Sequence, residues 1–329
     1  MAPADYAAAK RAAVQNALMK AGVSAEVLAP VIVPPRSRRR AVFEISCGEI
    51  GFHAANSHEI VDMHECLVLT PGLFALAQDL RTRFGFLKAP ADLYVTETRT
   101  GFDLGVRSPQ KLTPQMSVDL AGAVAGLNIV RVTFNNALAQ ETAAPQVDEG
   151  GVRVHLPPYA FLQATAEGEA ALQEQVLKIV GKARTVADLF SGVGTFALPL
   201  AKKARVHAVE QDVPALAALA AAARGGTGLK PVTTEQRDLF KLPLTPVELA
   251  PYEAVVLDPP RAGAEAQVRA LARAKVPAIA YVSCDAASFA RDAALLVAGG
   301  YRIGAVTPID QFLWSSHIEL VAEFKRAGA

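Results

Sequence analysis

Two residues near the carboxyl end of the chain could supply covalent catalysis. Cys284 follows the apolar run 278–282, and Glu319 lies 35 positions further on (319 − 284), beside a second apolar run. A lone cysteine after an apolar strand is usually an inert core residue. A thiol that shares a cleft with a carboxylate has another use, because the thiol can act as a nucleophile and the carboxylate as a general base. The pair predicts nucleophilic catalysis if the two strand ends meet.

A glycine turn and a later carboxylate indicate a site for an adenosine-containing cofactor. Gly192 and Gly194 follow the apolar run 185–189, and glycines at such a turn let a ligand approach the backbone. Glu210 ends the next predicted strand, 18 positions after Gly192 (210 − 192), where a carboxylate can accept both hydroxyls of a ribose. The pattern lacks the third glycine of G-x-G-x-x-G. A nicotinamide oxidoreductase is therefore the more distant alternative.

A proline pair follows another predicted strand, in the motif Asp258-Pro-Pro-Arg261. Prolines at the carboxyl end of a strand fix a rigid lip beside the ligand crevice of an α/β sheet. Such lips recur in methyltransferases that act on nucleobases, including those that methylate an amino nitrogen without any cysteine. A plain helix cap or turn residue is the other interpretation of Asp258.

The residues after 168 alternate between predicted helices and apolar strands, which specifies a doubly wound parallel sheet. Two late strands, at 301–306 and 317–324, have no helix between them, which is typical of the terminal antiparallel hairpin of class I methyltransferases. The other predicted strands are 185–189, 206–209, 231–234, 254–257 and 278–282, and the predicted helices are 169–180, one ending at 203, 214–224 and 287–298.

The first half of the chain follows a different pattern. A helix at 5–21 leads into a linker, and short alternating runs from 41 to 155 predict an antiparallel sheet. Helical periods at 71–83 and 114–126 make this half α+β, and a predicted loop at 140–151 marks its end. We therefore expect an N-terminal helix and basic linker at 1–40, a smaller α+β domain at 41–155 and a class I methyltransferase catalytic domain at 156–329.

The linker carries a basic run, with arginines at 36 and 38–40 after Pro34 and Pro35. The prolines hold the chain extended, so the guanidiniums could face the phosphates of a nucleic acid. A solvated linker is the alternative. The net charge of +1 does not choose between them, because most phosphate binders carry a strongly basic face.

The composition of the chain is that of a globular protein. The 329 residues are 51% hydrophobic and 20% charged, which fits two globular domains. No apolar run approaches about 18 residues, and the N-terminal segment lacks the pattern of a secretory signal. The cysteines, Cys47, Cys66 and Cys284, are too widely spaced for a disulfide framework or a CxxC metal knuckle. We expect reduced thiols and a cytoplasmic protein without a membrane partner.

Six motifs, in order, resemble the RNA uracil-5 methyltransferases, which make 5-methyluridine in bacterial ribosomal and transfer RNA. The resemblance covers nearly the whole chain. It implies S-adenosylmethionine as cofactor, RNA as partner with 23S rRNA before tRNA, RNA binding by 41–155, and a monomer. The motifs are Ser57-His-Glu-Ile-Val-Asp-Met-His-Glu-Cys66, Phe161-Leu-Gln163, Asp188-Leu-Phe-Ser-Gly-Val-Gly194, Asp258-Pro-Pro-Arg-Ala-Gly263, Val282-Ser-Cys284 and His317-Ile-Glu319.

The resemblance also implies a role for each site residue. Cys284 would be the nucleophile and Glu319 the base. Contacts to the cofactor would come from Gln163, Phe190, Gly192, Gly194, Glu210 and Asp258, with Asp238 near the adenine.

Carbon 5 of uracil is too poor a nucleophile to take a methyl group directly, so a thiolate must first add to carbon 6 and create an enolate. A base then removes the proton from carbon 5. The thiol must ionise near neutral pH, which an electropositive surrounding or the start of the helix after Cys284 would favour. The uridine must also be flipped out of its stack to reach the pocket.

The chain departs from the family at two places. The family commonly holds an iron–sulfur cluster with four cysteines, of which only the position of Cys66 is matched. We expect no metal site unless the natural N-terminus is longer than this chain. The family's Asn-Pro after the catalytic cysteine is here Asp285-Ala286, and a carboxylate beside the thiol would disfavour the thiolate. A degenerate relative that binds RNA without catalysis is therefore a further alternative.

Overall fold

The chain folds into two compact units. The computed structural model describes residues 2–46, 48–54, 57 and 59–326. Cys47 therefore lies outside the described residues, and so does His58 of the motif at 57–66. The bounds of the units differ from the ranges expected above, because the first 33 residues belong with the C-terminal half. Unit 1 comprises Met1–Val33, Glu149–Val154 and Glu167–Ala329, and unit 2 comprises Pro34–Asp148 and His155–Ala166.

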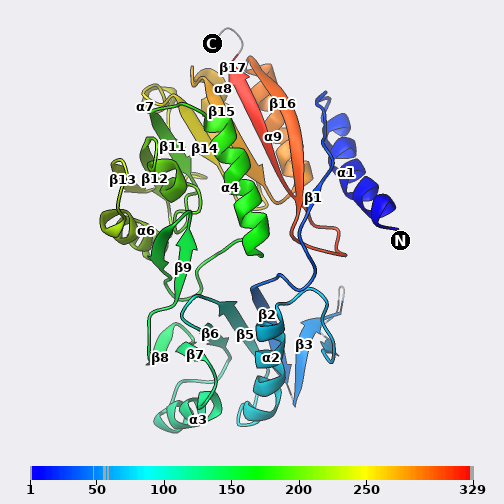
Figure 1. Cartoon of the computed structure of the whole chain (residues 1–329), viewed down its shortest axis with the longest axis vertical. Helices are drawn as coiled ribbons and strands as arrows, with labels where there is room; N and C mark the ends of the chain where they lie inside the picture. Colours follow the sequence, from blue (N-terminus) through cyan, green and yellow to red (C-terminus); the bar gives the residue numbers. More distant parts are fainter. Residues whose placement is uncertain (1, 47, 55–56, 58, 327–329) are drawn as a thin grey trace. The chain divides into compact units, whose positions relative to one another are not determined.

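Unit 1 contains an eight-stranded sheet in the order β1-β16-β17-β15-β14-β11-β12-β13 (Figure 1). Neighbouring strands are parallel except β17, which runs antiparallel to β15 and β16. The predicted doubly wound sheet with a terminal antiparallel hairpin is confirmed. The strands are β1 (Val31–Ile32), β11 (Thr185–Leu189), β12 (Arg205–Glu210), β13 (Val232–Gln236), β14 (Ala254–Leu257), β15 (Ala278–Ser283), β16 (Tyr301–Asp310) and β17 (Glu319–Arg326).

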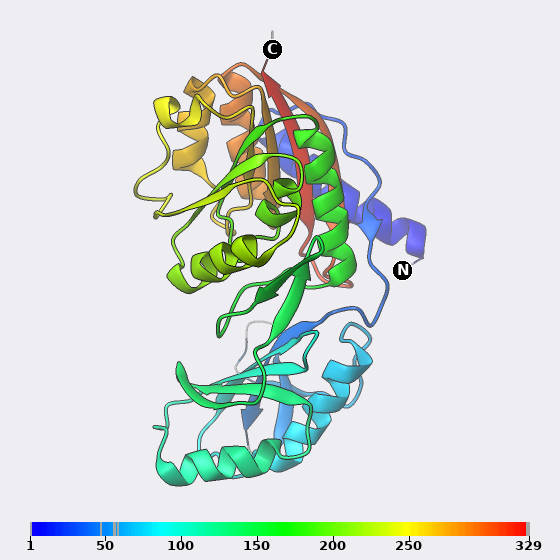
Figure 2. The same cartoon turned by 60° about the vertical axis from the view of Figure 1, so that its left-hand side comes forward.

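Helices cover both faces of this sheet, with α4 on one face and α8 and α9 on the other (Figures 1 and 2). The predicted N-terminal helix is confirmed as α1, which packs against α9. Val14 and Leu18 of α1 share one apolar core with Phe289 of α9. The helices are α1 (Pro3–Lys20), α4 (Ala166–Val180), α5 (Ala197–Ala201), α6 (Val213–Gly225), α7 (Pro246–Leu249), α8 (Glu265–Arg273) and α9 (Ala286–Ala298).

Local sequence explains where these elements begin. The Asp212 carboxylate accepts a hydrogen bond from Ala215 N (2.9 Å) and caps α6, and Thr245 forms a capping box with Glu248 at α7. All four residues of β14 are buried, because a central parallel strand is covered on both faces and must be apolar throughout.

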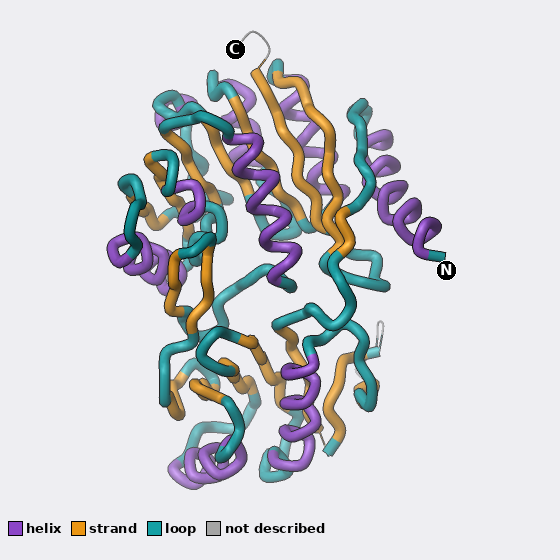
Figure 3. The backbone as a smooth tube through the Cα atoms, in the orientation of Figure 1, coloured by secondary structure: helices purple, strands orange, loops and turns teal. Residues whose placement is uncertain are grey.

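Unit 2 contains a seven-stranded sheet in the order β4-β3-β2-β5-β6-β7-β8, and Figure 3 distinguishes its strands from its two helices. The expectation of an antiparallel sheet is wrong for one pair, since β6 and β7 are parallel. The chain between them forms α3, and a parallel pair needs such a crossover. The elements are β2 (Arg40–Ser46), β3 (Glu49–His53), β4 (Ile60–Asp62), α2 (Pro71–Arg83), β5 (Ala91–Glu97), β6 (Phe102–Arg107), α3 (Pro114–Val124), β7 (Ile129–Phe134) and β8 (Ala137–Glu141).

The expectation of a loop at 140–151 is also wrong. Strand β9 (Gln146–Glu149) lies in this range and pairs with β10 (Val152–His155) in a two-stranded sheet. Val147 and Val152 are buried, so these short strands carry apolar side chains that the polar composition of the range conceals. No helix among the described residues has the length and apolar character needed to cross a bilayer.

Candidate active site

Strand direction brings the candidate site residues of unit 1 to one edge of its sheet. Strands β11, β12, β14 and β15 are parallel, so their carboxyl ends lie at the same edge, and the antiparallel β17 begins there. Ser283 at the end of β15 pairs with Leu320 of β17. Cys284 therefore follows one strand of this pair where Glu319 starts the other.

The thiol of Cys284 is half-buried and lies in an environment that keeps its proton. Burial, the Glu319 carboxylate and the Asp258 carboxylate raise its pKa to about 11, and the Arg261 guanidinium opposes them only in part. The expected electropositive surrounding is therefore wrong for the free site. The thiolate needs either a proton acceptor or an added positive charge to form near neutral pH.

Asp285, the departure from the family's motif, serves the fold. Its Oδ1 accepts a hydrogen bond from Ser288 N (2.7 Å), so the carboxylate caps the first turn of α9. The main charges that shift the pKa of Cys284 are instead Glu319, Asp258 and Arg261. The expected effect of Asp285 on the thiol is thus replaced by a role in starting the helix.

The pKa values of two carboxyl groups at the same edge are raised. Burial raises the pKa of Asp258 to about 7. Asp188, at the end of β11, is fully buried, and its pKa is raised well above the ordinary range by burial and by the charges of Asp258 and Glu210. A positive charge that arrives at this edge would favour the ionised form of both groups.

The glycine turn after β11 leaves room for a ligand. Gly192 has a φ of +52°, and no atom of the described residues lies within 4 Å of the position that a Cβ would take. Gly194 has a φ of +106° and packs so closely on α6 that a Cβ would lie 2.5 Å from Leu219 Cδ1. The first glycine thus keeps space open, and the second fixes the turn to the helix.

Glu210, at the end of β12, is hydrogen-bonded to this turn. Its Oε2 accepts a hydrogen bond from Gly192 N (3.0 Å), and its Oε1 accepts from Gln211 N (2.7 Å) and Asp212 N (2.9 Å). These backbone donors hold the carboxylate in one orientation. The lone pair that remains on Oε2 can accept a hydroxyl of a ribose.

Aromatic and acidic side chains follow strands β11 and β13. Phe190 lies directly after β11, and its ring centroid is 5.5 Å from that of Phe240, whose side chain is exposed. Asp238 accepts a hydrogen bond from Phe240 N (3.0 Å), and a hydrogen bond from Lys241 lowers the pKa of its carboxyl. Two rings beside an ionised acceptor suit a flat base with amino groups.

Two sequence-predicted positions lie in unit 2. Gln163 is buried there, and its backbone carbonyl accepts a hydrogen bond from Arg39 Nε (3.3 Å). Cys66 is a partly exposed free thiol. Among the described residues, no group of three or more His, Cys, Asp or Glu side chains could hold a metal ion. The described residues therefore do not fit an iron–sulfur cluster, which needs four ligands.

Several residues near the site escaped the sequence analysis. A pocket of about 480 Å³ is lined by Cys284 and His317 and also by Asn16 and Lys20 of α1. Arg261 Nη2 lies 3.1 Å from His317 Nδ1. No spacing signal could reveal the contribution of α1, since Lys20 and Cys284 are 264 positions apart (284 − 20). The Arg261–His317 contact joins two motifs that the sequence analysis had treated separately.

Comparisons with known proteins agree with this architecture. The family described as tRNA (uracil-5-)-methyltransferase matches residues 111–326, well over half of the chain. The chain is 48% identical over 321 residues to an uncharacterized RNA methyltransferase of Brucella suis biovar 1, covering 95% of this chain and 77% of the relative. It is 34% identical over 307 residues to the 23S rRNA (uracil(1939)-C(5))-methyltransferase of Chromohalobacter salexigens, covering 86% of this chain and 63% of that protein.

A solved structure shares the fold. The crystal structure of Pyrococcus abyssi tRNA (uracil-54, C5)-methyltransferase in complex with S-adenosyl-L-homocysteine aligns with a TM-score of 0.75 at 21% identity, covering 96% of this chain and 81% of that chain. The fold is that of the class I S-adenosylmethionine-dependent methyltransferases. With the family match and the relatives above, the chain belongs to the tRNA (uracil-5-)-methyltransferase family.

Proposed function

We propose that this chain is an S-adenosylmethionine-dependent RNA methyltransferase that forms 5-methyluridine through a covalent bond between Cys284 and carbon 6 of the uracil. The observation that carries the proposal is the meeting of Cys284 and Glu319 at the ends of β15 and β17, at the edge that also carries the glycine turn. Methylation of an amino nitrogen needs no thiol, so it would leave Cys284 without a role.

The catalytic cycle assigns opposite tasks to the two residues. Cys284 Sγ bonds to carbon 6, its proton passes to a carboxylate, and the ring electrons move onto the carbonyl oxygen to give an enolate. S-adenosylmethionine supplies an electrophilic methyl group when bound, and carbon 5 takes it. Glu319 then removes the proton from carbon 5, and the electrons of that bond expel the Cys284 thiolate and restore the ring.

The high pKa of Cys284 gives this cycle a physical requirement. At neutral pH the thiol holds its proton, because burial and two carboxylates disfavour a further negative charge. The pKa falls when a sulfonium cation binds at this edge, since a positive charge stabilises the thiolate. Asp258, with a pKa raised to about 7, is a suitable acceptor for the thiol proton near neutral pH.

The cofactor site is proposed around the glycine turn. Glu210 would accept a ribose hydroxyl, and Phe190 and Phe240 would flank the adenine with Asp238 as hydrogen-bond acceptor. The backbone of Gly192 and Gly194 would line the methionine part. The predicted contacts of Gln163 and Asp258 complete the set.

Unit 2 is proposed to bind RNA, and arginine–aromatic pairs on it support this role. The Arg40 guanidinium carbon lies 4.5 Å from the centroid of Phe161, whose ring is exposed. Arg107 lies 4.8 Å from Tyr94 and 4.6 Å from Tyr159 in the same way. Unstacked bases of single-stranded RNA bind to such surfaces by stacking on rings and guanidinium planes.

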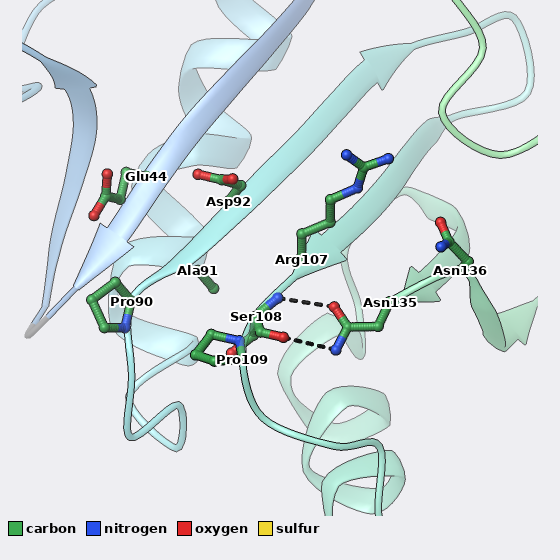
Figure 4. Close-up of a pocket in the computed structure, with 9 residues that line it drawn as sticks. All are labelled: Glu44, Pro90, Ala91, Asp92, Arg107, Ser108, Pro109, Asn135 and Asn136. Carbon is green, nitrogen blue, oxygen red and sulfur yellow. Dashed lines mark hydrogen bonds between the residues drawn. The ribbon is translucent and has the colours of Figure 1, made fainter.

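Arg107 also lines a pocket of about 400 Å³ (Figure 4). One end of this pocket is rigid, because the Asn135 side chain accepts a hydrogen bond from Ser108 N (3.0 Å) and donates one to Ser108 O (2.8 Å). A preformed hollow beside an exposed guanidinium suits one nucleotide of a bound strand.

The basic run, with arginines at 36 and 38–40, is in part held by hydrogen bonds of the fold. Arg38 Nε, for example, donates to Arg40 O (3.0 Å).

We propose 23S rRNA as the substrate, with tRNA as the alternative. The 34% identity with a 23S rRNA methyltransferase favours rRNA, whereas the likeness to a tRNA methyltransferase structure is one of fold. Nucleoside analysis of RNA methylated by the pure protein tests the reaction. We expect 5-methyluridine from wild type and none from Cys284→Ala. A methylated amino nitrogen, or 5-methyluridine from Cys284→Ala, would replace this proposal with the amino-methylating alternative or a structural thiol.

A further inference from the structure

The N-terminal helix α1 forms one wall of the pocket that contains Cys284. Asn16 and Lys20, near its C-terminal end, line this pocket of about 480 Å³ together with Cys284 and His317. The volume lies within the range of about 300 to 1,000 Å³ in which small-molecule pockets fall. The pocket that Cys284 lines therefore has room for a group of nucleotide size.

The fold fixes α1 firmly at this position. Lys10 is buried, and its ammonium lies 2.9 Å from Asp310 Oδ1 and donates to the carbonyl of His317 (2.6 Å). Tyr6 donates to the same Asp310 carboxylate (2.5 Å) and accepts from Trp314 N (2.9 Å). A buried anchor, Lys10, and a partly buried one, Tyr6, thus hold α1 against the end of β16 and the segment that follows it, so the wall is built before any ligand arrives.

The side chains that α1 presents to the pocket are polar and available. Asn16 and Lys20 are both exposed, and among the described residues neither side chain has a hydrogen-bond or ion-pair partner. Arg291, on the same pocket, is partly neutralised by Asp292 at 2.8 Å, and the Asp285 carboxylate is engaged as the cap of α9. The free charge facing the pocket is therefore the ammonium of Lys20.

We propose that Asn16 and Lys20 of α1 bind the phosphodiester backbone of the RNA next to the uridine that enters the Cys284 site. This inference rests on the proposed function. A flipped nucleotide rotates about its backbone, so the phosphates on either side of it stay at the mouth of the pocket. A lysine ammonium is a compact charge that suits a phosphate without reading a base. The site therefore positions the strand and adds no sequence preference.

The test compares Lys20→Ala, Lys20→Arg and Asn16→Ala with Arg11→Ala, a cation on an exposed part of α1 that does not line the pocket. Binding is measured with a 23S rRNA transcript in the Cys284→Ala background, so that no adduct forms. We expect Lys20→Ala to weaken RNA binding about 3- to 10-fold and to reduce the salt dependence by about one phosphate contact. Lys20→Arg should restore most of the affinity, and Arg11→Ala should match the parent.

The affinity for S-adenosylhomocysteine and the melting temperature are measured on the same variants, and we expect both to be unchanged. The inference is overturned if Lys20→Ala binds RNA like Arg11→Ala, or if it loses cofactor affinity or stability as much as RNA affinity. Failure of the proposed function looks different, because wild type would then form no 5-methyluridine whatever the result for Lys20.

Discussion

The Cys284 thiol, which we propose as the nucleophile, lies among carboxylates. Glu319 and Asp258 both raise the pKa of Cys284, and burial adds to their effect. A thiol with a pKa of about 11 is almost entirely protonated at neutral pH, so we expect the free enzyme to resist alkylation and oxidation at this position. Reactivity therefore depends on what binds at the sheet edge.

The pH dependence of alkylation tests this property. Iodoacetamide reacts with the thiolate, so we expect the modification of Cys284 to be slow at neutral pH and to accelerate about tenfold per pH unit toward its pKa. Glu319→Gln removes one negative neighbour, which lowers the pKa and speeds the reaction at any pH below it. Peptide mass spectrometry measures the rate, and Glu323→Gln on the same strand is the control. Rapid modification of wild-type Cys284 at neutral pH would contradict the account.

Glu210 makes the second residue-scale prediction. Replacement by Ala removes a carboxylate proposed to hold the ribose, and a hydrogen bond to a charged group contributes roughly 1.5 to 3 kcal/mol, or about 10- to 150-fold in affinity. We expect this loss for S-adenosylhomocysteine in calorimetry. Because Glu210 also holds Gly192 N, the melting temperature is the control for a loosened turn. Unchanged affinity in a folded variant would remove Glu210 from the cofactor site.

Elements far apart in the sequence pack together in unit 1. Lys10 of α1 is buried against Asp310 of β16, and the two residues are 300 positions apart. The pair also supports the segment that leads to Glu319, since Lys10 donates to the carbonyl of His317. Helix α1 is thus held against the segment that leads to Glu319.

Removal of one member of this pair should be costly. Lys10→Ala leaves the Asp310 carboxylate buried without its counter-charge, which typically costs about 3 to 5 kcal/mol of stability. We expect a clear drop in melting temperature and, because the segment before Glu319 loosens, in kcat. The double variant Lys10→Ala/Asp310→Ala should recover part of the stability. Equal stability of Lys10→Ala and Arg11→Ala would show that the ion pair contributes little.

Strands with a clear local pattern were predictable from the sequence. The runs at β11 and β14 are short and mostly apolar, and the predicted limits, 185–189 and 254–257, match the structure. The parallel pair β6–β7 was missed because nothing in a single strand reveals the direction of its neighbour. The two-residue strand β1 was missed because it exists only through its pairing with β16. In this pair Val31 lies opposite Ile309 and Ile32 lies opposite Asp310.

At the scale of the whole molecule, the motifs and their order could be predicted from the sequence, but the residues that surround each motif in the fold could not. The strand ends that carry Cys284 and Glu319 meet as the class I topology requires. The raised pKa of Cys284, the use of Asp285 as a cap and the wall made by α1 depend on packing between distant segments. The spacing of residues in the sequence does not show which side chains are buried or which charges the fold brings together.

The most direct test of the central claim is a denaturing gel of protein and substrate RNA. Glu319→Gln keeps the nucleophile but lacks the base, so methyl transfer can occur while elimination stalls, and a protein–RNA adduct should accumulate. Wild type should be trapped in the same way by RNA with 5-fluorouridine at the target. Both adducts should persist in Cys66→Ala and vanish in Cys284→Ala. An adduct that survives the loss of Cys284, or none in either trap, would contradict a covalent role for this thiol.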